Sequence, residues 1–393
     1  MTTTTSDKTG AVKEYARYAN HTFAGWLKTV PTDLPKAFKP MIHVTSEGIL
    51  IFCIVEDRFV VYKYDQIQNT TKEIASFNTE EYFHTGGEFL HHQSFLLNVR
   101  YIYFMKNSFP TDEEHIYFYE TKSKKLLSIK NDDTRPQTFR VNHTVSVNPN
   151  DLKLYFFGGL NYEMECLNSI EVYNLETYQW EKIETKGTPP EPRHSHNSFL
   201  IGPNLYILGG TKAKDFYSKG GNFEDFHMLN LGTMTWSPLR LYGESPKSLN
   251  YNYTFQITRK YIIFASCEKN HDYWETKLTR FDLNLYEWKD MEVVSGAPEF
   301  RLGAGYCFDE ENMTCLLFGG LDPSKEGSKS LTNEMNKIKL AENRESFDGL
   351  ELMVDDRPVT KSVKNQEESK QNDKENSSLD GIFLFVKKLL FFH

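Results

Sequence analysis

Few residues in this chain have the types and spacing that enzyme chemistry requires. Glu163 and Glu165 form a close acid pair of the kind that could exchange a proton, but no base or metal ligand stands beside them. The five cysteines form no Cys-x-x-Cys pair and no Cys/His cluster at zinc spacing. The sequence also lacks Gly-x-Ser-x-Gly, the Gly-x-x-x-x-Gly-Lys-Ser/Thr phosphate loop and His-Glu-x-x-His. We therefore expect no catalytic residue, no metal and no cofactor, and we interpret the acid pair as part of a solvated loop.

Composition narrows the class of protein. The chain has 393 residues and a formal net charge of -9, which disfavours a broad nucleic-acid surface. Aromatic residues make up 14% of it, a content that suits strands better than helices. The N-terminus lacks the apolar segment of a signal peptide, and no run reaches the roughly 18 apolar residues of a membrane span. These features predict a cytoplasmic protein with free thiols.

One short pattern recurs three times and organises the chain. An apolar residue is followed by Asn or Asp and then by Leu, and a Trp stands seven residues after the first position. The copies are Tyr173-Asn174-Leu175 with Trp180, Leu229-Asn230-Leu231 with Trp236, and Phe281-Asp282-Leu283 with Trp288. A fixed period of about 50 residues indicates a repeat protein in which each unit is one supersecondary element.

Two further features share this period. Apolar runs upstream of the pattern end in a glycine pair, and an Arg stands thirteen residues after two of the Trp residues. The glycine pairs are Gly158-Gly159, Gly209-Gly210 and Gly319-Gly320, and the cations are Arg193 and Arg301. A glycine pair fits a strand end where the backbone turns and packs closely, and Trp gives the outer strand a large apolar surface. We interpret each unit as a small β-sheet.

The first and last units complete each other. Trp26 is followed thirteen residues later by Lys39, so it has the spacing of an outer strand whose three inner strands are missing. Two divergent units cover about 40–138 and three clearer units cover about 139–300. A sixth unit begins at Arg301 and stops near Leu340 without its Trp strand. We expect the strand around Trp26 to close the sixth sheet, so that no sheet lacks a strand, and residues 350–354 are the alternative closing strand.

The whole pattern resembles the Kelch repeat, in which the Trp is followed by Pro-x-x-Arg-x-x-His. Pro190, Arg193 and His196 fit this spacing, and Arg140 precedes His143 in the same way. The resemblance covers roughly residues 22–341 and is specific in the three middle units and the sixth. The fifth unit departs from it, with Ala265-Ser266 in place of the glycine pair and Leu249 in place of Arg. The resemblance implies an all-β fold, here a six-bladed Kelch-type β-propeller. The galactose oxidases share the Kelch-like propeller.

The resemblance also implies a place for a partner. The Arg position of Kelch propellers faces one mouth of the central channel, where family members bind acidic or polar peptide segments. The residues at this position are Arg140, Arg193, Arg301 and Lys39. A cationic ring would suit bidentate capture of carboxylates, and the alternative is that each Arg pairs with a neighbouring loop and holds the blades in register. By the same logic we expect His143 and His196 to be packed repeat positions rather than ligands.

Long connections between the second and third strands border the same mouth, and recognition commonly resides in such loops. Three aromatic residues in these connections are Phe216, Tyr217 and Trp274. They are candidate anchors for a partner, and the alternative is that they belong to solvated insertions.

These features favour a non-catalytic scaffold or adaptor that binds a protein segment on one propeller face. The resemblance is compatible with cytoskeletal or cell-polarity, trafficking and ubiquitin-adaptor types. The alternative is an enzyme or a small-molecule-modifying factor that uses the channel, which a buried cluster of titratable groups would favour.

The two ends of the chain differ in composition from residues 22–341. Residues 1–21 are polar and Thr-rich, and residues 342–380 are charged, so we expect both to be disordered. Residues 381–393 are apolar around Lys387-Lys388. Three interpretations stay open for this segment: contact with a membrane surface, docking onto a partner or the propeller, and an exposed terminus without a role.

Overall fold

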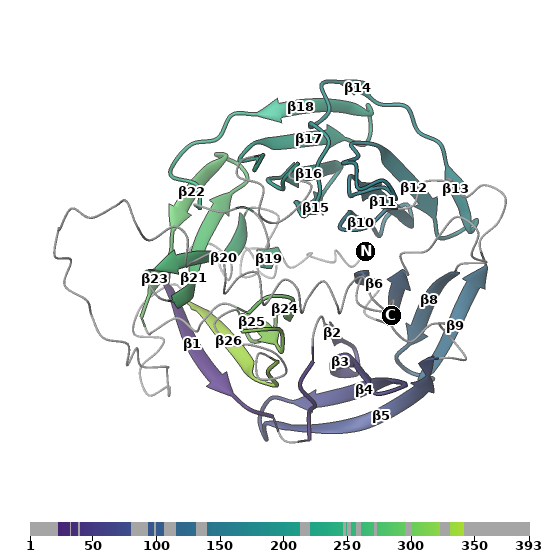
Figure 1. The fold of residues 1–393 in the computed structure, drawn as a ribbon, viewed down its shortest axis with the longest axis vertical. Coiled ribbons are helices and arrows are strands. Elements are labelled where there is room, and N and C mark those ends of the chain that lie inside the picture. The colour runs from purple at the N-terminus through teal and green to yellow at the C-terminus, as the bar shows by residue number, and fades with distance from the viewer. Residues whose placement is uncertain are drawn as a thin grey trace, which may run out of the picture.

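The fold is a closed ring of six sheets around a common centre (Figure 1). The computed structural model describes residues 23–31, 33–37, 40–79, 93–97, 100–105, 115–130, 140–212, 221–246, 249, 253–256, 261–270, 273–294, 301–322 and 331–341. Every named element in these ranges is a strand. The predicted all-β, six-bladed Kelch-type propeller is therefore confirmed.

We number the blades along the chain, and within each blade the strands run in sequence order from the centre outward. Blade 1 holds β2 (Met41–Thr45), β3 (Gly48–Val55), β4 (Arg58–Asp65) and β5 (Thr70–Asn78), and blade 2 holds β6 (Gln93–Leu97), β7 (Tyr101–Met105), β8 (His115–Glu120) and β9 (Lys125–Lys130). Blade 3 holds β10 (Thr144–Asn148), β11 (Lys153–Phe157), β12 (Ile170–Asn174) and β13 (Gln179–Glu181), and blade 4 holds β15 (Asn197–Ile201), β16 (Asn204–Leu208), β17 (Phe226–Asn230) and β18 (Thr235–Leu239). Blade 5 holds β19 (Tyr253–Gln256), β20 (Tyr261–Asn270), β21 (Tyr273–Asp282) and β22 (Glu287–Asp290), and blade 6 holds β24 (Gly305–Asp309), β25 (Thr314–Phe318) and β26 (Met335–Ala341).

The fourth strand of blade 6 comes from the N-terminal end of the ring. β1 (Phe23–Thr29) pairs antiparallel with β26 over its whole length, and Trp26 lies opposite Ile338. A 2.6 Å ion pair between Lys28 Nζ and Glu334 Oε1 adds to this seam. The expected closure through Trp26 is thus confirmed. The alternative strand at 350–354 lies outside the described residues.

Short parallel segments fasten blades 4 to 6 to the blade before them. After the outer strand of blade 3, β14 (Lys186–Gly187) pairs parallel with β18 of blade 4. After blade 5, β23 (Glu292–Val293) pairs parallel with β1. Between them, Tyr242 bridges to Glu287 in the same sense. We call these segments the straps. They cover the outer edges of blades 4, 5 and 6, which an open sheet would leave unpaired.

Apolar side chains fill the space between neighbouring blades. Each of the six interfaces, including the seam between blades 6 and 1, contains one cluster of buried residues contributed by both blades. Trp236 and Trp288 are each only 3% exposed and belong to such clusters. Trp180 is partly exposed and packs against Phe156 and Tyr173 at centroid distances of 4.9 and 5.1 Å. The Trp positions therefore act as interblade wedges, as their size suggests.

The Asn or Asp of the recurring pattern shapes the turn between the third and fourth strands. Asn174 Oδ1 accepts hydrogen bonds from the N–H groups of Glu176 and Thr177, at 2.8 and 3.1 Å. Asp282 Oδ1 does the same for Asn284 and Leu285 at 2.9 and 3.1 Å. The side chain replaces backbone partners that the turn lacks, which is why a short polar residue recurs there.

The glycine pairs end the second strands where the chain passes close to other backbone. Gly158 and Gly159 have φ angles of 64° and 94°. A Cβ on Gly158 would lie 2.6 Å from the carbonyl oxygen of Arg193 in blade 4, and one on Gly159 would lie 2.7 Å from that of Val141. Both the backbone conformation and the space therefore exclude a side chain. Gly209, Gly210, Gly319 and Gly320 have the same positive φ and equally close backbone neighbours.

The terminal segments predicted at 1–21, 342–380 and 381–393 all lie outside the described residues. Among the residues that are described, no helix is long and apolar enough to cross a membrane.

Candidate protein-interaction face

One end of the ring gathers the Arg positions and the connections between second and third strands. We call it the mouth face. It is the end at which the inner strands begin and the second strands finish. Because strands within a blade are antiparallel, the turns between first and second strands and between third and fourth strands lie at the opposite end.

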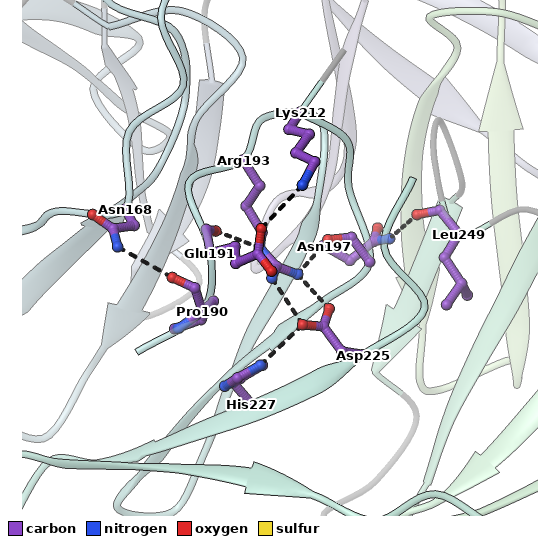
Figure 2. Close-up of polar contacts among 10 residues, drawn as sticks. Asn168, Pro190, Glu191, Arg193, Asn197, Lys212, Asp225, His227 and Leu249 are labelled. Carbon is purple, nitrogen blue, oxygen red and sulfur yellow. Dashed lines mark hydrogen bonds and ion pairs between the residues drawn. The ribbon is translucent and has the colours of Figure 1, made fainter. Parts of the chain in front are cut away.

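Arg193 lies at this face with a fully buried side chain (Figure 2). Its Nη1 and Nη2 donate to the two oxygens of Asp225 at 2.6 and 2.9 Å, and Nη1 also reaches the carbonyl of Gly209 at 2.9 Å. The guanidinium stacks on the ring of Phe223 at 4.0 Å from its centroid. This arrangement ties the entry of blade 4 to the start of its third strand.

Asp225 is shared between Arg193 and a histidine. His227 Nε2 lies 3.0 Å from Asp225 Oδ2. Burial opposes ionisation of Asp225, but hydrogen bonds from Arg193 and His227 outweigh burial and hold the pKa of the carboxyl well below its usual range. The carboxylate is therefore charged at all ordinary pH values and neutralises Arg193.

Arg140 and Arg301 repeat this arrangement in blades 3 and 6. Arg140, 6% exposed, forms a 2.5 Å ion pair with Glu171 and donates to Gly158 O at 3.0 Å. Arg301, 7% exposed, pairs with Glu334 at 3.0 Å and Asp322 at 3.4 Å. Glu334 also holds Lys28, so one carboxylate links the mouth of blade 6 to the closing strand. In all three blades the Arg is paired within its own blade.

The structure thus pairs Arg140, Arg193 and Arg301 with carboxylates of their own blades, which differs from the pairing with a neighbouring loop that the sequence analysis gave as the structural alternative. Contact of these residues with a partner stays a prediction, and their guanidinium groups form no open cationic ring. Lys39, Phe216 and Tyr217 lie outside the described residues. Trp274 lies in β21, and for this residue only the backbone is described.

Blade 5 lacks the buried pair and is built differently at this face. Leu249 occupies the Arg position and is 2% exposed, and Lys277 stands where blades 4 and 6 have Asp225 and Glu334. Lys277 pairs instead with Asp290 at 3.2 Å. With Ala265-Ser266 in place of a glycine pair, β20 and β21 run on as a hairpin from Cys267↔Thr276 to Asn270↔Tyr273. We call the paired residues 267–270 and 273–276 the blade-5 hairpin.

Blade 3 presents a compact loop at the same face. Asn161 fixes it, because its Oδ1 accepts the N–H of Glu165 at 2.8 Å and its own N–H donates to the Glu165 carbonyl at 2.9 Å. Tyr162 projects from this loop with 66% of its surface exposed, and Glu163 beside it is exposed as well. The acid pair thus lies in a solvated loop, as expected.

The centre of the ring is held by hydrogen bonds between inner strands of neighbouring blades. His43 Nε2 and Ser94 Oγ are 2.8 Å apart, Thr144 Oγ1 and His196 Nε2 are 2.7 Å apart, and Ser146 Oγ and Ser198 Oγ are 2.8 Å apart. Burial lowers the pKa of His43 to about 4 and that of His143 to about 3. Burial also lowers the pKa of His196 well below its usual value. These three histidines are neutral and packed, and His143 and His196 occupy the repeat position expected for them.

The same part of the chain holds no group of three or more His, Cys, Asp or Glu residues that could bind a metal ion. His43, His143 and His196 each lie against packed hydroxyl or aromatic groups.

Sequence reasoning missed the acids that neutralise the Arg residues. They were detectable, because Glu171, Asp225 and Glu334 stand 31, 32 and 33 residues after Arg140, Arg193 and Arg301. It also missed Gly187 and Gly243, which stand seven residues after Trp180 and Trp236. Both lie in the straps with positive φ, close against the next blade's Trp.

Comparison with known proteins agrees with this geometry. Residues 101–320 match the family model described as the KLHDC2/KLHL20/DRC7 Kelch-repeats domain. The chain belongs to the Kelch-repeat family. This agrees with the repeat positions that the structure brings together, from the glycine pairs to the interblade Trp residues.

Several curated proteins are similar over part of this Kelch-repeat chain. Acyl-CoA-binding domain-containing protein 5 of Arabidopsis thaliana is 35% identical over 193 residues, which is 49% of this chain and 28% of the relative. Kelch domain-containing protein 1 of Mus musculus is 28% identical over 196 residues, 43% of this chain and 45% of the relative. Tip elongation aberrant protein 1 of Schizosaccharomyces pombe is 28% identical over 177 residues, 43% of this chain and 15% of the relative. The chain spans less than half the length of each of these relatives. The family indicates, in general terms, a propeller that serves as a protein-interaction scaffold.

Proposed function

We propose that this protein is a non-catalytic scaffold or adaptor that binds a segment of a partner protein on its mouth face. The observation that carries the proposal is the contrast between a uniform frame and varied connections. Blades 3, 4 and 6 share one buried Arg–carboxylate frame, whereas the described connections between second and third strands, in blades 1, 3 and 5, differ from one another. Variation on a rigid scaffold is the usual arrangement of a recognition surface.

The varied connections are described in three blades. Blade 1 has a tight turn at Glu56 and Asp57, blade 3 has the loop around Tyr162, and blade 5 has a four-pair hairpin. Exposed Tyr162 offers a partner a rigid aromatic contact, and such residues dominate the binding energy of many interfaces. Binding through these connections requires no chemistry in the ring, so we propose the absence of catalysis together with the scaffold role.

The type of scaffold follows from the partner. A propeller that binds a peptide segment fits a cytoskeletal or cell-polarity role, a trafficking role or a ubiquitin-adaptor role. We also propose that the protein is located in the cytoplasm. The name of the fission-yeast relative, Tip elongation aberrant protein 1, is in keeping with a cell-polarity type.

The experiment that tests the function is affinity capture from native lysate with the full chain, read by quantitative mass spectrometry. The comparison is Tyr162→Ala/Glu163→Ala, which alters two exposed residues of the mouth face and leaves the buried Arg pairs intact. We expect specific partners whose capture falls with this variant. Unchanged capture by a folded variant would remove the blade-3 loop from the binding site, and the absence of any reproducible partner would contradict the scaffold role.

A further inference from the structure

A basic turn joins β8 and β9 of blade 2 at the end of the ring opposite the mouth face (Figure 1). We call residues 120–125 the blade-2 turn. Its three lysines, Lys122, Lys124 and Lys125, are exposed, and none forms an ion pair with a described residue. The equivalent turns of blades 1, 3, 4 and 5 contain no Lys or Arg at 66–69, 175–178, 231–234 and 283–286.

The blade-2 turn keeps the backbone geometry of its counterparts. Its last residue, Lys124, has a φ of 56°, and the four equivalent residues have φ angles from 50° to 59°. By strand register, Glu120 corresponds to Asn174 of blade 3. The N–H groups of Lys122 and Ser123 therefore face the point that the side-chain oxygen of Asn174 fills in blade 3.

A side-chain oxygen fills this point in four other blades, but not in blade 2. One oxygen accepts two turn N–H groups at 2.8–3.1 Å in blades 1, 3 and 5, and one N–H at 3.0 Å in blade 4. In blade 2 the Glu120 carboxylate is engaged elsewhere, because Arg100 Nε donates to its Oε1 at 2.8 Å and the Ser123 hydroxyl donates to its Oε2. The N–H groups of Lys122 and Ser123 make no hydrogen bond within the described part of the chain.

The charges around these two N–H groups favour an anion. Hydrogen bonds from Ser123 and Arg100 lower the pKa of Glu120, so this carboxylate is ionised and matched by the Arg100 guanidinium. The three lysines of the turn remain as unmatched positive charge. Neighbouring backbone N–H groups in such a turn form a concave donor pair that suits an oxyanion. A phosphate group, with three acceptor oxygens and a charge near about −2, satisfies more of these donors than a carboxylate does.

Charge elsewhere on this end indicates what carries the phosphate. Glu47, Glu176, Glu310 and Glu311 are exposed at turns of blades 1, 3 and 6 on the same end of the ring. A broad anionic surface, such as a membrane or a nucleic acid, would meet these carboxylates and be repelled by them. A single phosphate on a narrow protein segment can reach the blade-2 turn without meeting them.

We propose that the blade-2 turn binds the phosphate group of a phosphorylated segment of a partner protein. A phosphate oxygen accepts the N–H groups of Lys122 and Ser123, in the place that Asn or Asp oxygens occupy in the other blades, and the lysines neutralise its charge. The site lies at the end opposite the mouth face, so it goes beyond the proposed mouth-face function and does not depend on it.

The test uses a degenerate library of short peptides with phosphoserine fixed at the centre, and the same library with serine as its reference. Peptides enriched on the full chain are then measured by fluorescence anisotropy. We expect each to bind at least about tenfold more tightly than its unphosphorylated form, because hydrogen bonds to a charged group are lost with the phosphate. The amide resonances of Lys122 and Ser123 should shift when the phosphopeptide is added to the isotope-labelled chain.

The variant Glu120→Asn separates the backbone site from net charge. The Oδ1 atom of the new side chain should accept the N–H groups of Lys122 and Ser123, as Asn174 does in its own turn. The change also removes a negative charge, so attraction by net charge alone predicts tighter binding. We expect phosphopeptide binding to weaken instead by at least about tenfold, with the stability of the chain unchanged or higher.

Two double variants separate these lysines from lysines in general. Lys122→Gln/Lys125→Gln should weaken phosphopeptide binding by at least about tenfold. The matched control, Lys63→Gln/Lys72→Gln, removes two exposed lysines of blade 1, whose turn oxygen is already supplied by Asp65. It should leave binding within about twofold, because salt screens charges that do not contact the phosphate.

Equal or tighter binding by folded Glu120→Asn would overturn this site, and so would a library that yields no phosphate-dependent binder. Vesicles of phosphatidylserine and phosphatidylcholine test the membrane alternative. Sedimentation of the chain with such vesicles through Lys122 and Lys125, without phosphopeptide binding, would replace the protein segment by a membrane and overturn the proposal. These variants leave the mouth face unaltered, so partner capture there tests the scaffold role separately.

Discussion

The guanidinium of Arg193 is excluded from water and held by both oxygens of Asp225, which determines the effect of removing it. Arg193→Met should lower the free energy of unfolding by about 3 kcal/mol, because the carboxylate and the Gly209 carbonyl lose their donor in a largely buried site. Urea denaturation monitored by Trp fluorescence measures this loss.

The control for that variant is Lys212→Met. Lys212 pairs with Glu191 at 3.2 Å, and both side chains are more than half exposed. Water screens such a pair, so we expect a change of less than about 1 kcal/mol. Equal losses from the two variants would show that the Arg193 pair does not stabilise the blade.

Two buried tyrosines provide a second comparison at this scale. The hydroxyl of Tyr119 lies buried with no hydrogen-bond partner among the described residues, whereas that of Tyr253 contacts the Arg301 carbonyl and the Ala304 N–H. Tyr119→Phe should leave stability unchanged or raise it slightly, because it removes an unsatisfied polar group. Tyr253→Phe should lower it by about 1–2 kcal/mol. Thermal and urea unfolding of the two variants measure these changes in stability. A larger loss from Tyr119→Phe than from Tyr253→Phe would contradict the view that the Tyr119 hydroxyl is unsatisfied.

The sequence predicted repeat residues whose roles are local, and it left open roles that depend on distant partners. Asn174 and Asp282 act within three residues of themselves, so their recurrence shows their role. Arg193 is held by Asp225. The repeat spacing predicts the position of this cation, but it does not identify the carboxylate that pairs with it. Whether such a cation is free or neutralised depends on a contact 32 residues away.

At the scale of elements, the straps depend on glycine. Gly187 has φ 79° and a Cβ there would lie 2.3 Å from the carbonyl oxygen of Trp236. Gly187→Ala should therefore cost about 2–4 kcal/mol, which combines the left-handed backbone conformation with a clash against backbone.

Gly202 is the matched control for the strap. Its φ is 57°, but nothing lies within 4 Å of a Cβ built there. Gly202→Ala should cost only the conformational part, about 1–2 kcal/mol. Chemical denaturation of both variants separates the two contributions, and equal costs would show that the strap moves away from Trp236 without loss.

The order of strands and the closure by the Trp26 strand could be predicted because each follows from one period in the sequence. The blade-5 hairpin could not be predicted in this way. Ala265-Ser266 signalled the loss of a glycine pair, but the sequence gives no length for what replaces it. The straps were also missed, because a pairing of two residues such as Lys186–Gly187 leaves no periodic pattern.

At the scale of the whole molecule, the ring should weaken in mild acid. His43, His143 and His196 are buried in neutral form, and burial is the main cause of their lowered pKa values. The unfolded chain binds protons on these residues below about pH 6.5 and the folded ring does not, so stability falls as pH falls from about 6.5 to about 4. His143 should cost about 2 kcal/mol at pH 5, because its folded-state pKa of about 3 lies below that pH.

Urea midpoints at pH 7.5 and pH 5.0 measure this effect above the range in which the paired carboxylates titrate. His143→Gln should reduce the difference between the two pH values by about 2 kcal/mol if the variant stays folded. A stability that is flat between pH 7.5 and 5.0 would contradict the buried, neutral state of these histidines.

The ring as a whole presents two ends of different character, and the central claim is that partners bind at the mouth face. The most direct measurement is quantitative affinity capture from native lysate with three forms of the full chain. One is unaltered. The second carries Tyr162→Ala/Glu163→Ala. The third carries Ile67→Ala/Tyr178→Ala/Leu285→Ala, which truncates exposed apolar residues of the opposite end, 97%, 48% and 56% exposed. We predict that the second form loses partners that the first and third retain, and the reverse pattern would contradict the mouth face as the binding site.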